Sequence, residues 1–65
     1  MRILVNGDSR EVCSADLSAA LEELGYRGAV IATALNGEFV PAGTRQAARL
    51  SEGDELEVLA PMQGG

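Results

Sequence analysis

The sequence contains no histidine, lysine or tryptophan, and only one cysteine, Cys13. A single cysteine excludes a disulfide within the chain, and without histidine a zinc site of the cysteine/histidine type is excluded. General acid and base catalysis usually draws on histidine, lysine, tyrosine or paired buried carboxylates. We therefore expect a protein that is not an enzyme, binds no metal or cofactor, and offers no ε-amino group as an acyl acceptor.

Positive charge is also scarce: the chain has five arginines and ten acidic residues, for a net charge of -5. Such a chain repels a phosphate backbone, so nucleic acid is not an expected partner, whereas a basic protein surface is. No apolar run approaches the ~20 residues of a membrane span, and the residues after Met1 are not typical of a signal peptide. We expect a reduced, cytoplasmic protein with no membrane partner and with both ends native.

Two Asn-Gly pairs mark the strand-rich parts of the chain. This dipeptide is the strongest short hairpin signal, because both residues accept the positive φ of a type I′ turn. The flanking strands are expected at residues 1–5 and 9–13 around Asn6-Gly7, and at 29–35 and 38–40 around Asn36-Gly37. The sequence therefore predicts two hairpins.

Between the hairpins the spacing predicts one helix. Asp16 is suited to cap its start and Gly25 to end it. The apolar positions at i, i+3, i+4 and i+7 are Leu17, Ala20, Leu21 and Leu24. After the second hairpin, residues 41–50 are a connection with one helical turn, residues 51–54 are a turn, and residues 55–60 are the last strand.

This order of hairpin, helix, hairpin and strand leaves few topologies, because the helix must cover one sheet face and the crossover should be right-handed. It indicates an α+β domain of the β-grasp, or ubiquitin-like, arrangement. We expect a mixed sheet of four to five strands, with the first and last strands as central neighbours. The domain spans residues 1–60, and residues 61–65 form a flexible tail that ends in Gly-Gly.

In the last strand, Leu56, Val58 and Ala60 alternate with Glu55, Glu57 and Leu59. If the first set meets the helix, Leu59 lies on the open sheet face among carboxylates. It is then either a singly exposed leucine, which is common, or an apolar anchor for a partner beside an acidic steering patch. The second interpretation makes Leu59, Glu57 and Glu55 a partner interface.

Five segments stand in order along the chain: Asn6-Gly7, Leu21–Gly25, Ala34–Pro41, Glu52–Val58 and the terminal Gly64-Gly65. Together they resemble the ThiS-type sulfur carrier proteins of thiamin biosynthesis, which are related to MoaD. Two features depart from that family: the loop 13–16 looks shorter, and Gln63 precedes the Gly-Gly pair where many relatives have another small residue.

The resemblance implies that a ThiF-type adenylyltransferase, using ATP and Mg²⁺, adenylates the Gly65 carboxylate. Sulfur from a persulfide donor then replaces AMP, and the thiocarboxylate supplies the thiazole synthase ThiG. Activation is needed because a carboxylate is a poor electrophile. Five residues extend to about 17 Å, enough to enter a partner's cleft. Gly64 permits close backbone approach, while Met62 and Gln63 supply apolar and amide contacts.

Alternatives remain open. The chain is otherwise a MoaD-like, tRNA-thiolation or cysteine-synthesis sulfur carrier, a ubiquitin-like protein modifier, or an interaction domain whose tail is a frayed end or a purification scar.

The remaining candidate residues have structural interpretations. Cys13 is expected to be a small buried residue rather than a sulfur relay, Tyr26 and Phe39 to pack in the core or at its rim, and Arg45 and Arg49 to lie on a solvated face.

Overall fold

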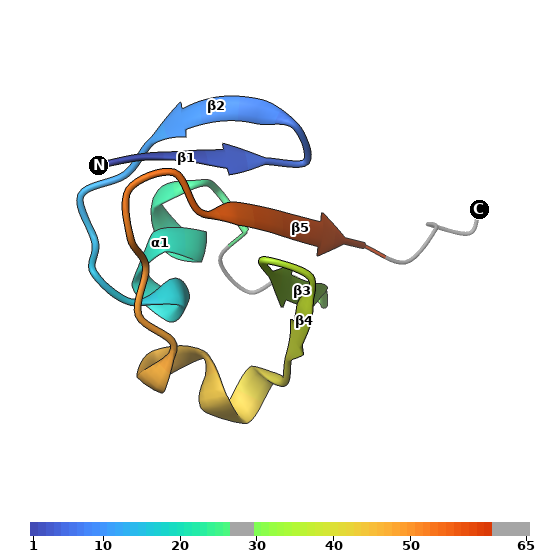
Figure 1. Ribbon diagram of the computed structural model, residues 1–65. Coiled ribbons are helices and arrows are strands. Elements are labelled where there is room, and N and C mark those ends of the chain that lie inside the picture. Colours follow the sequence, from blue (N-terminus) through green and yellow to red (C-terminus); the bar gives the residue numbers. More distant parts are fainter. Residues whose placement is uncertain (27–29, 61–65) are drawn as a thin grey trace.

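The structure, a computed structural model, describes residues 1–26 and 30–60. Five strands form one mixed sheet in the order β2-β1-β5-β3-β4, and a helix lies against one of its faces (Figure 1). β1 and β5 are parallel neighbours at the centre of the sheet, and the other pairs are antiparallel. This is the predicted α+β, β-grasp arrangement. The elements are β1 (Arg2–Val5), β2 (Asp8–Glu11), α1 (Leu17–Glu23), β3 (Ala32–Leu35), β4 (Glu38–Val40), the 3₁₀ helix η1 (Ala42–Ala47) and β5 (Glu55–Leu59).

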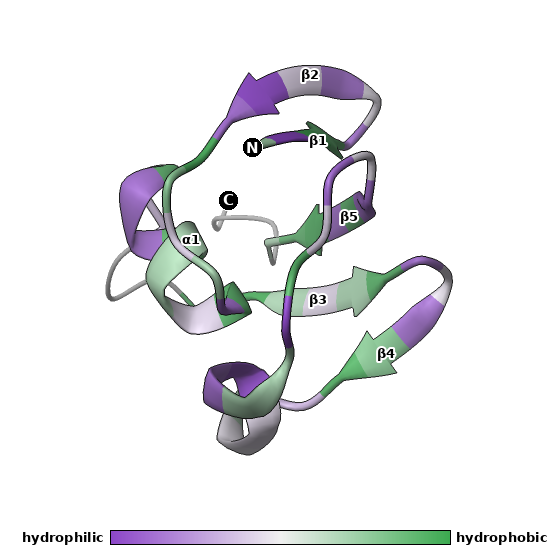
Figure 2. Ribbon diagram, turned by 60° about the vertical axis from the view of Figure 1, so that its left-hand side comes forward, coloured by the Kyte–Doolittle hydropathy of each residue, from purple (hydrophilic) through white to green (hydrophobic). Residues whose placement is uncertain are grey.

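Both hairpins turn at their Asn-Gly pairs, as predicted. Asn6 and Asn36 each have a φ of 51°, and Gly7 and Gly37 follow with φ of 87° and 86°. Positive φ at both central residues is what a type I′ turn requires. β2, at one edge of the sheet, is exposed throughout and strongly hydrophilic (Figure 2), which disfavours edge-to-edge pairing with another sheet.

The helix begins and ends where its capping residues predict. The Oδ1 atom of Asp16 accepts a hydrogen bond from the amide of Ala19 at 2.8 Å. At the other end Gly25 has a φ of 96°. The Gly25 amide donates to the Glu22 carbonyl and the Tyr26 amide to the Leu21 carbonyl, the two bonds of a Schellman motif.

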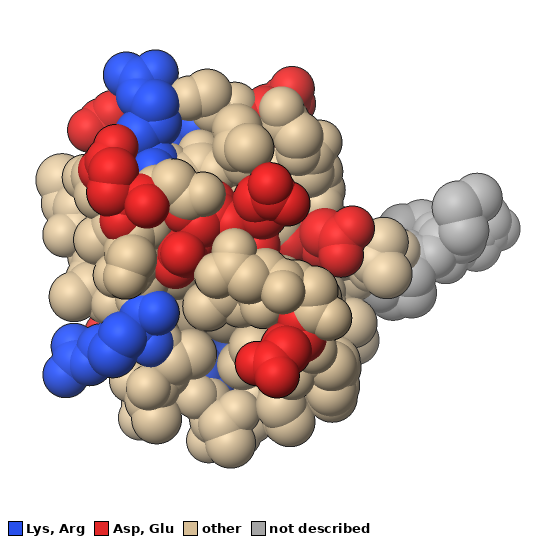
Figure 3. All heavy atoms as spheres, viewed as in Figure 1, with Lys and Arg blue, Asp and Glu red and all other residues tan. Residues whose placement is uncertain are grey.

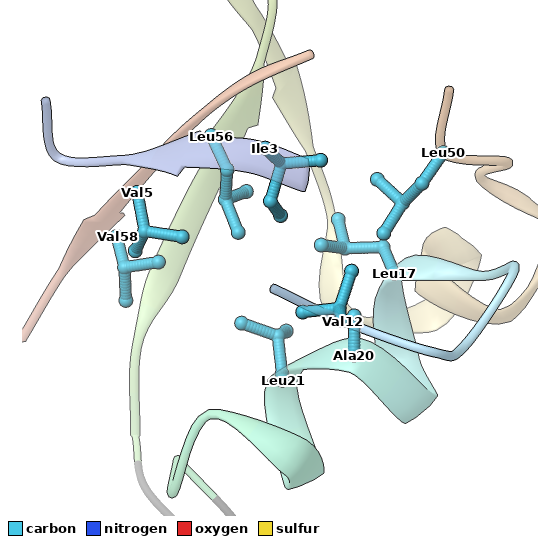
Figure 4. Packing of buried hydrophobic residues seen from close by; sticks show 9 residues of the cluster. All are labelled: Ile3, Val5, Val12, Leu17, Ala20, Leu21, Leu50, Leu56 and Val58. Atoms are coloured by element: carbon cyan, nitrogen blue, oxygen red, sulfur yellow. The ribbon is translucent and has the colours of Figure 1, made fainter. Parts of the chain in front are cut away.

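The core lies between the sheet and α1, where side chains from the central strands point toward the helix (Figure 4). The predicted helix stripe is confirmed, with Leu24 only partly buried. Leu50 joins the core because residues 48–50 run beside the start of α1: the Leu17 amide donates to the Ala48 carbonyl, and the Leu50 amide to the Ala15 carbonyl. The buried apolar residues are Ile3, Val5, Val12, Leu17, Ala20, Leu21, Leu50, Leu56 and Val58.

Cys13 is exposed, and the prediction that it is buried is wrong. β2 ends at Glu11 instead of residue 13, and Val12 takes the inward position with 1% exposure. The next residue therefore faces outward. Its amide donates to both carboxylate oxygens of Glu23, at 2.9 and 3.2 Å, so main-chain hydrogen bonding rather than burial holds this loop.

The second hairpin also departs from the prediction. β3 begins at Ala32, not at residue 29, which lies outside the described residues, and Val30 is 79% exposed. Phe39 does not pack in the core but is 69% exposed, because Val40 takes the inward position of this short strand. Tyr26 does pack against the core, as predicted.

Candidate functional site

The candidate site is the face of the sheet opposite α1, which we call the open face. It follows from strand alternation: Leu56 and Val58 of β5 point into the core, so the residues between and beside them point away from it. The same rule applies to β1, where Ile3 and Val5 are buried and Leu4 is not. Arg2 on β1 and its β2 neighbours Ser9 and Glu11 lie on this face. The open-face residues that line its two hollows are Leu4, Ala32, Ala34, Phe39, Glu55, Glu57 and Leu59.

Strand register places an apolar patch at one end of the open face. Leu59 pairs with Ala32, and Ala34 lies between Glu57 and Phe39 in the adjacent row. Leu59 is 71% exposed. These side chains line one shallow hollow together, so Leu59 is part of a patch and not an isolated exposed leucine. An anchor role for Leu59 in docking a partner stays a prediction.

A groove of about 460 Å³ adjoins this patch and lies between the two Asn-Gly turns. Its lining includes the two predicted carboxylates, Glu55 and Glu57, together with Leu4. Gly7 and Gly37 border it without side chains. Figure 3 shows acidic side chains along the course that β5 takes in Figure 1, with the larger groups of arginine atoms at the left-hand side of the view. The groove is therefore suited to a cationic group of a partner.

The structure brings the predicted interface residues together, since Leu59, Glu57 and Glu55 all lie on β5 and all on the open face. The predicted tail residues Met62, Gln63, Gly64 and Gly65 lie outside the described residues. They follow in the sequence directly after Pro61 and the end of β5. In the sequence, β5 of the open face therefore directly precedes the segment that ends in Gly65, the predicted reactive residue.

Sequence reasoning missed two members of the site, Leu4 and Phe39. The signal for Leu4 was strand alternation, which places Ile3 and Val5 on one face of β1 and Leu4 on the other. For Phe39 it was the neighbouring Val40, because consecutive strand residues face opposite sides and only one of them can be inside. Phe39 lies opposite Ala34, whose small side chain leaves space around the aromatic ring.

Chemically the open face offers apolar surface and carboxylates, which suit binding rather than catalysis. Among the carboxyl groups of residues 1–26 and 30–60, the one with a clearly shifted pKa lies elsewhere: hydrogen bonds from the Ser14 side chain and the Cys13 amide lower the pKa of Glu23. Within residues 1–26 and 30–60, no cluster of three or more His, Cys, Asp or Glu side chains is placed to hold a metal ion. Across the same residues, no helix has the length and apolar character to cross a membrane.

Solved structures of known proteins resemble this chain along its whole length. A crystal structure of thiamine biosynthesis protein ThiS from Geobacter metallireducens has a TM-score of 0.81 and 30% sequence identity, with 100% of both chains covered. A solution structure of a thiamine biosynthesis protein from Geobacter metallireducens has a TM-score of 0.78 and 29% identity, covering 100% of this chain and 88% of that one.

A curated relative is longer. The chain is 33% identical over 66 residues to a thiazole synthase of Paramagnetospirillum magneticum, with 100% of this chain and 20% of that protein covered. This chain therefore spans only a fifth of the length of that relative. The model of the ThiS family matches residues 3–65, which include α1, β2 to β5, all of β1 except Arg2, and the Gly-Gly pair. The chain belongs to the ThiS family.

Proposed function

We propose that this chain is a sulfur carrier of thiamin biosynthesis and that the carboxylate of Gly65 carries the sulfur. The observation that carries this proposal is the match to the ThiS family, which extends through Gly65. The chain acts in this proposal as a co-substrate of partner enzymes rather than as a catalyst. Because the chain has a single cysteine and no disulfide to form, the cytoplasm is the proposed compartment.

The proposed chemistry takes place in the active site of a partner. A ThiF-type adenylyltransferase joins the Gly65 carboxylate to the AMP part of ATP, with Mg²⁺, and releases pyrophosphate. The terminal sulfur of a persulfide then attacks the activated carbonyl and displaces AMP. A thiol then attacks the donor's sulfur in the resulting acyl disulfide, forms a disulfide with it, and releases the thiocarboxylate on Gly65. ATP, Mg²⁺ and the persulfide belong to the partners, so the carrier itself holds no cofactor.

The open face is the proposed docking surface for the adenylyltransferase. Leu59 and Phe39 supply apolar contact area, and Glu55 and Glu57 steer a basic surface toward it. Docking through β5 places the neighbouring residues 61–65 at the partner's cleft. There Gly64 permits close approach, and Met62 and Gln63 are the proposed recognition contacts.

A thiazole synthase of the ThiG type is the proposed acceptor of the sulfur. The relative from Paramagnetospirillum magneticum bears that name, and one part of it is similar to this chain. A carrier segment and a thiazole synthase within one protein are consistent with their acting in consecutive steps. The comparisons do not favour the other carriers or the protein modifier, because the family model and both solved structures concern thiamin biosynthesis.

Intact mass spectrometry tests the proposal. After incubation with a ThiF-type enzyme, ATP, Mg²⁺ and a persulfide source, the mass should rise by the replacement of one oxygen by sulfur. A variant without Gly65 should not be charged, whereas Glu22→Gln, on the helix side of the sheet, should be charged like the wild type. Unmodified wild-type protein under conditions that charge a known relative would refute the proposal. The mass of protein from its native cells also shows directly whether Gly65 ends the chain.

A further inference from the structure

The two edges of β5 are paired to different extents. On one edge β3 accompanies the strand from Leu56 to Leu59. On the other edge the pairing with β1 covers Glu55 and Leu56, and the last main-chain bond runs from the Asn6 amide to the Leu56 carbonyl at 2.9 Å. β1 ends there because the chain turns at Asn6-Gly7. Val58 therefore has no strand beside it on this edge.

The side chain of Asn6 takes the place of the missing strand. Its Oδ1 accepts from the Val58 amide at 2.9 Å, and its Nδ2 donates to the Val58 carbonyl at 3.1 Å. One carboxamide thus satisfies both main-chain groups of a residue 52 positions away, as a neighbouring strand would. The bonds are partly buried, so water replaces them incompletely.

Asn36 provides a natural comparison at the other end of the same strand. It has the same φ of 51° and also precedes a glycine. Its Oδ1 accepts from the Glu55 amide at 2.9 Å, and its Nδ2 donates to Asp54 Oδ1 at 3.1 Å. Asn36 therefore holds the start of β5, whereas Asn6 holds the end that leads to Leu59 and the tail.

We propose that Asn6 is a positioning residue for sulfur charging, because its carboxamide holds Val58 and thereby orients the neighbouring docking residue, Leu59, for the partner. The inference rests on the proposed function, in which Leu59 docks and Gly65 reacts. Leu59 is the residue after Val58, so its orientation on the open face follows that of the main chain at Val58. Without Asn6, the main chain at Val58 loses its hydrogen bonds on one edge, and fewer encounters with the partner present Leu59 in the docking orientation.

Glycine substitutions at the two positions test this directly, because glycine tolerates the positive φ that strains other residues. In Asn6→Gly the Val58 amide should exchange its hydrogen about tenfold faster, while the Glu55 amide is unchanged. In Asn36→Gly the Glu55 amide should exchange faster, while the Val58 amide is unchanged. If either glycine variant does not fold, Asn6→Asp and Asn36→Asp serve instead: each keeps the acceptor oxygen, so amide exchange should change little, and loses the donor at neutral pH, so the KM for charging is then the readout.

The charging reaction supplies the functional readout, with each variant used as the carrier substrate. Asn6→Gly should raise KM by roughly tenfold with little change in kcat, which corresponds to the loss of one to two hydrogen bonds. Asn36→Gly should change KM by less than about twofold and cost less stability, because the bonds of the Asn36 side chain are exposed. If the role of Asn6 were purely structural, KM would follow the loss of stability across the two variants.

The outcomes separate this inference from the proposed function. Equal KM values for the two glycine variants, or an unchanged exchange rate at Val58 in Asn6→Gly, would overturn the positioning role of Asn6. If the wild type itself is not charged, the proposed function fails. The exchange rates of Val58 and Glu55 in the free proteins then decide alone whether Asn6 holds the end of β5.

Discussion

Arg45 lies against Thr33, and the two side chains join η1 to the second hairpin. The Arg45 Nε donates to the Thr33 Oγ1 at 3.1 Å, and the Arg45 Nη2 donates to the Ile31 carbonyl at 2.8 Å. Thr33, which is 2% exposed, donates in turn to the Val40 carbonyl at 2.9 Å. The prediction that Arg45 belongs to a solvated face is therefore wrong. Arg45 supports the two strands that carry Ala34 and Phe39 on the open face.

Replacing Arg45 with methionine should lower the free energy of unfolding by about 1–2 kcal/mol, because the Ile31 carbonyl and the Thr33 hydroxyl each lose a partly buried donor. Methionine retains the length and apolar stem of arginine, so the loss reports hydrogen bonding. Urea unfolding measures it. The matched control is Arg49→Met at an exposed position, where a change within about 0.5 kcal/mol is expected. Equal effects at both positions would contradict the structural role of Arg45.

Leu59→Thr should weaken binding to a ThiF-type enzyme by about tenfold while leaving stability nearly unchanged. The reason is that Leu59 is 71% exposed in the free protein, and in the proposed function it becomes buried only against a partner. Threonine preserves the strand preference of the position. Calorimetric titration gives the Kd, and thermal unfolding gives the stability. Unaltered binding would show that Leu59 is an ordinary exposed leucine with no role in docking.

Removing the carboxylates of the groove should affect the rate of association. The double variant Glu55→Gln, Glu57→Gln should associate with the same enzyme roughly tenfold more slowly at low salt, and its rate should depend less on ionic strength. Stopped-flow measurements over a range of salt concentrations test this. Glu22→Gln on α1 removes a charge from the other side of the sheet and should have little effect. A rate that is insensitive to Glu55 and Glu57 would exclude electrostatic steering by this groove.

Glu23 makes stability depend on pH in the acid range. The Ser14 side chain and the Cys13 amide, which donate to its carboxylate, lower its pKa from the ordinary value of 4.5. A group with a lowered pKa in the folded state stabilises the protein above its unfolded pKa, and this stabilisation is lost as the pH falls through the folded pKa. Glu23→Gln should therefore be less stable than the wild type at neutral pH. The difference should shrink below a pH of about 4.5.

Urea unfolding of both proteins at a series of pH values measures that difference. Glu22→Gln, at the adjacent helix position, controls for the loss of one negative charge from α1. If the difference between the wild type and Glu23→Gln stays constant as the pH falls, the carboxylate of Glu23 does not hold the loop at Cys13 and Ser14.

Features set by neighbouring residues were predictable from the sequence. The turns at Asn6-Gly7 and Asn36-Gly37 follow from the φ angles that these dipeptides accept, and Asp16 and Gly25 delimit α1 through bonds to residues within one turn. The inward positions of β5 follow from alternation alone. Strand ends were less predictable, as β2 and β3 show, because a strand ends where its partner ends.

The sequence by itself therefore determined the order of elements, the caps, the turns and the faces of β5, since each depends on interactions over a few positions. Tertiary structure alone decided that Phe39 shares a surface with Leu59, that Arg45 binds Thr33, and that Asn6 completes the sheet at Val58. These contacts depend on the register of strands far apart in the chain. Local propensity carries no information about which distant main-chain group will lack a partner.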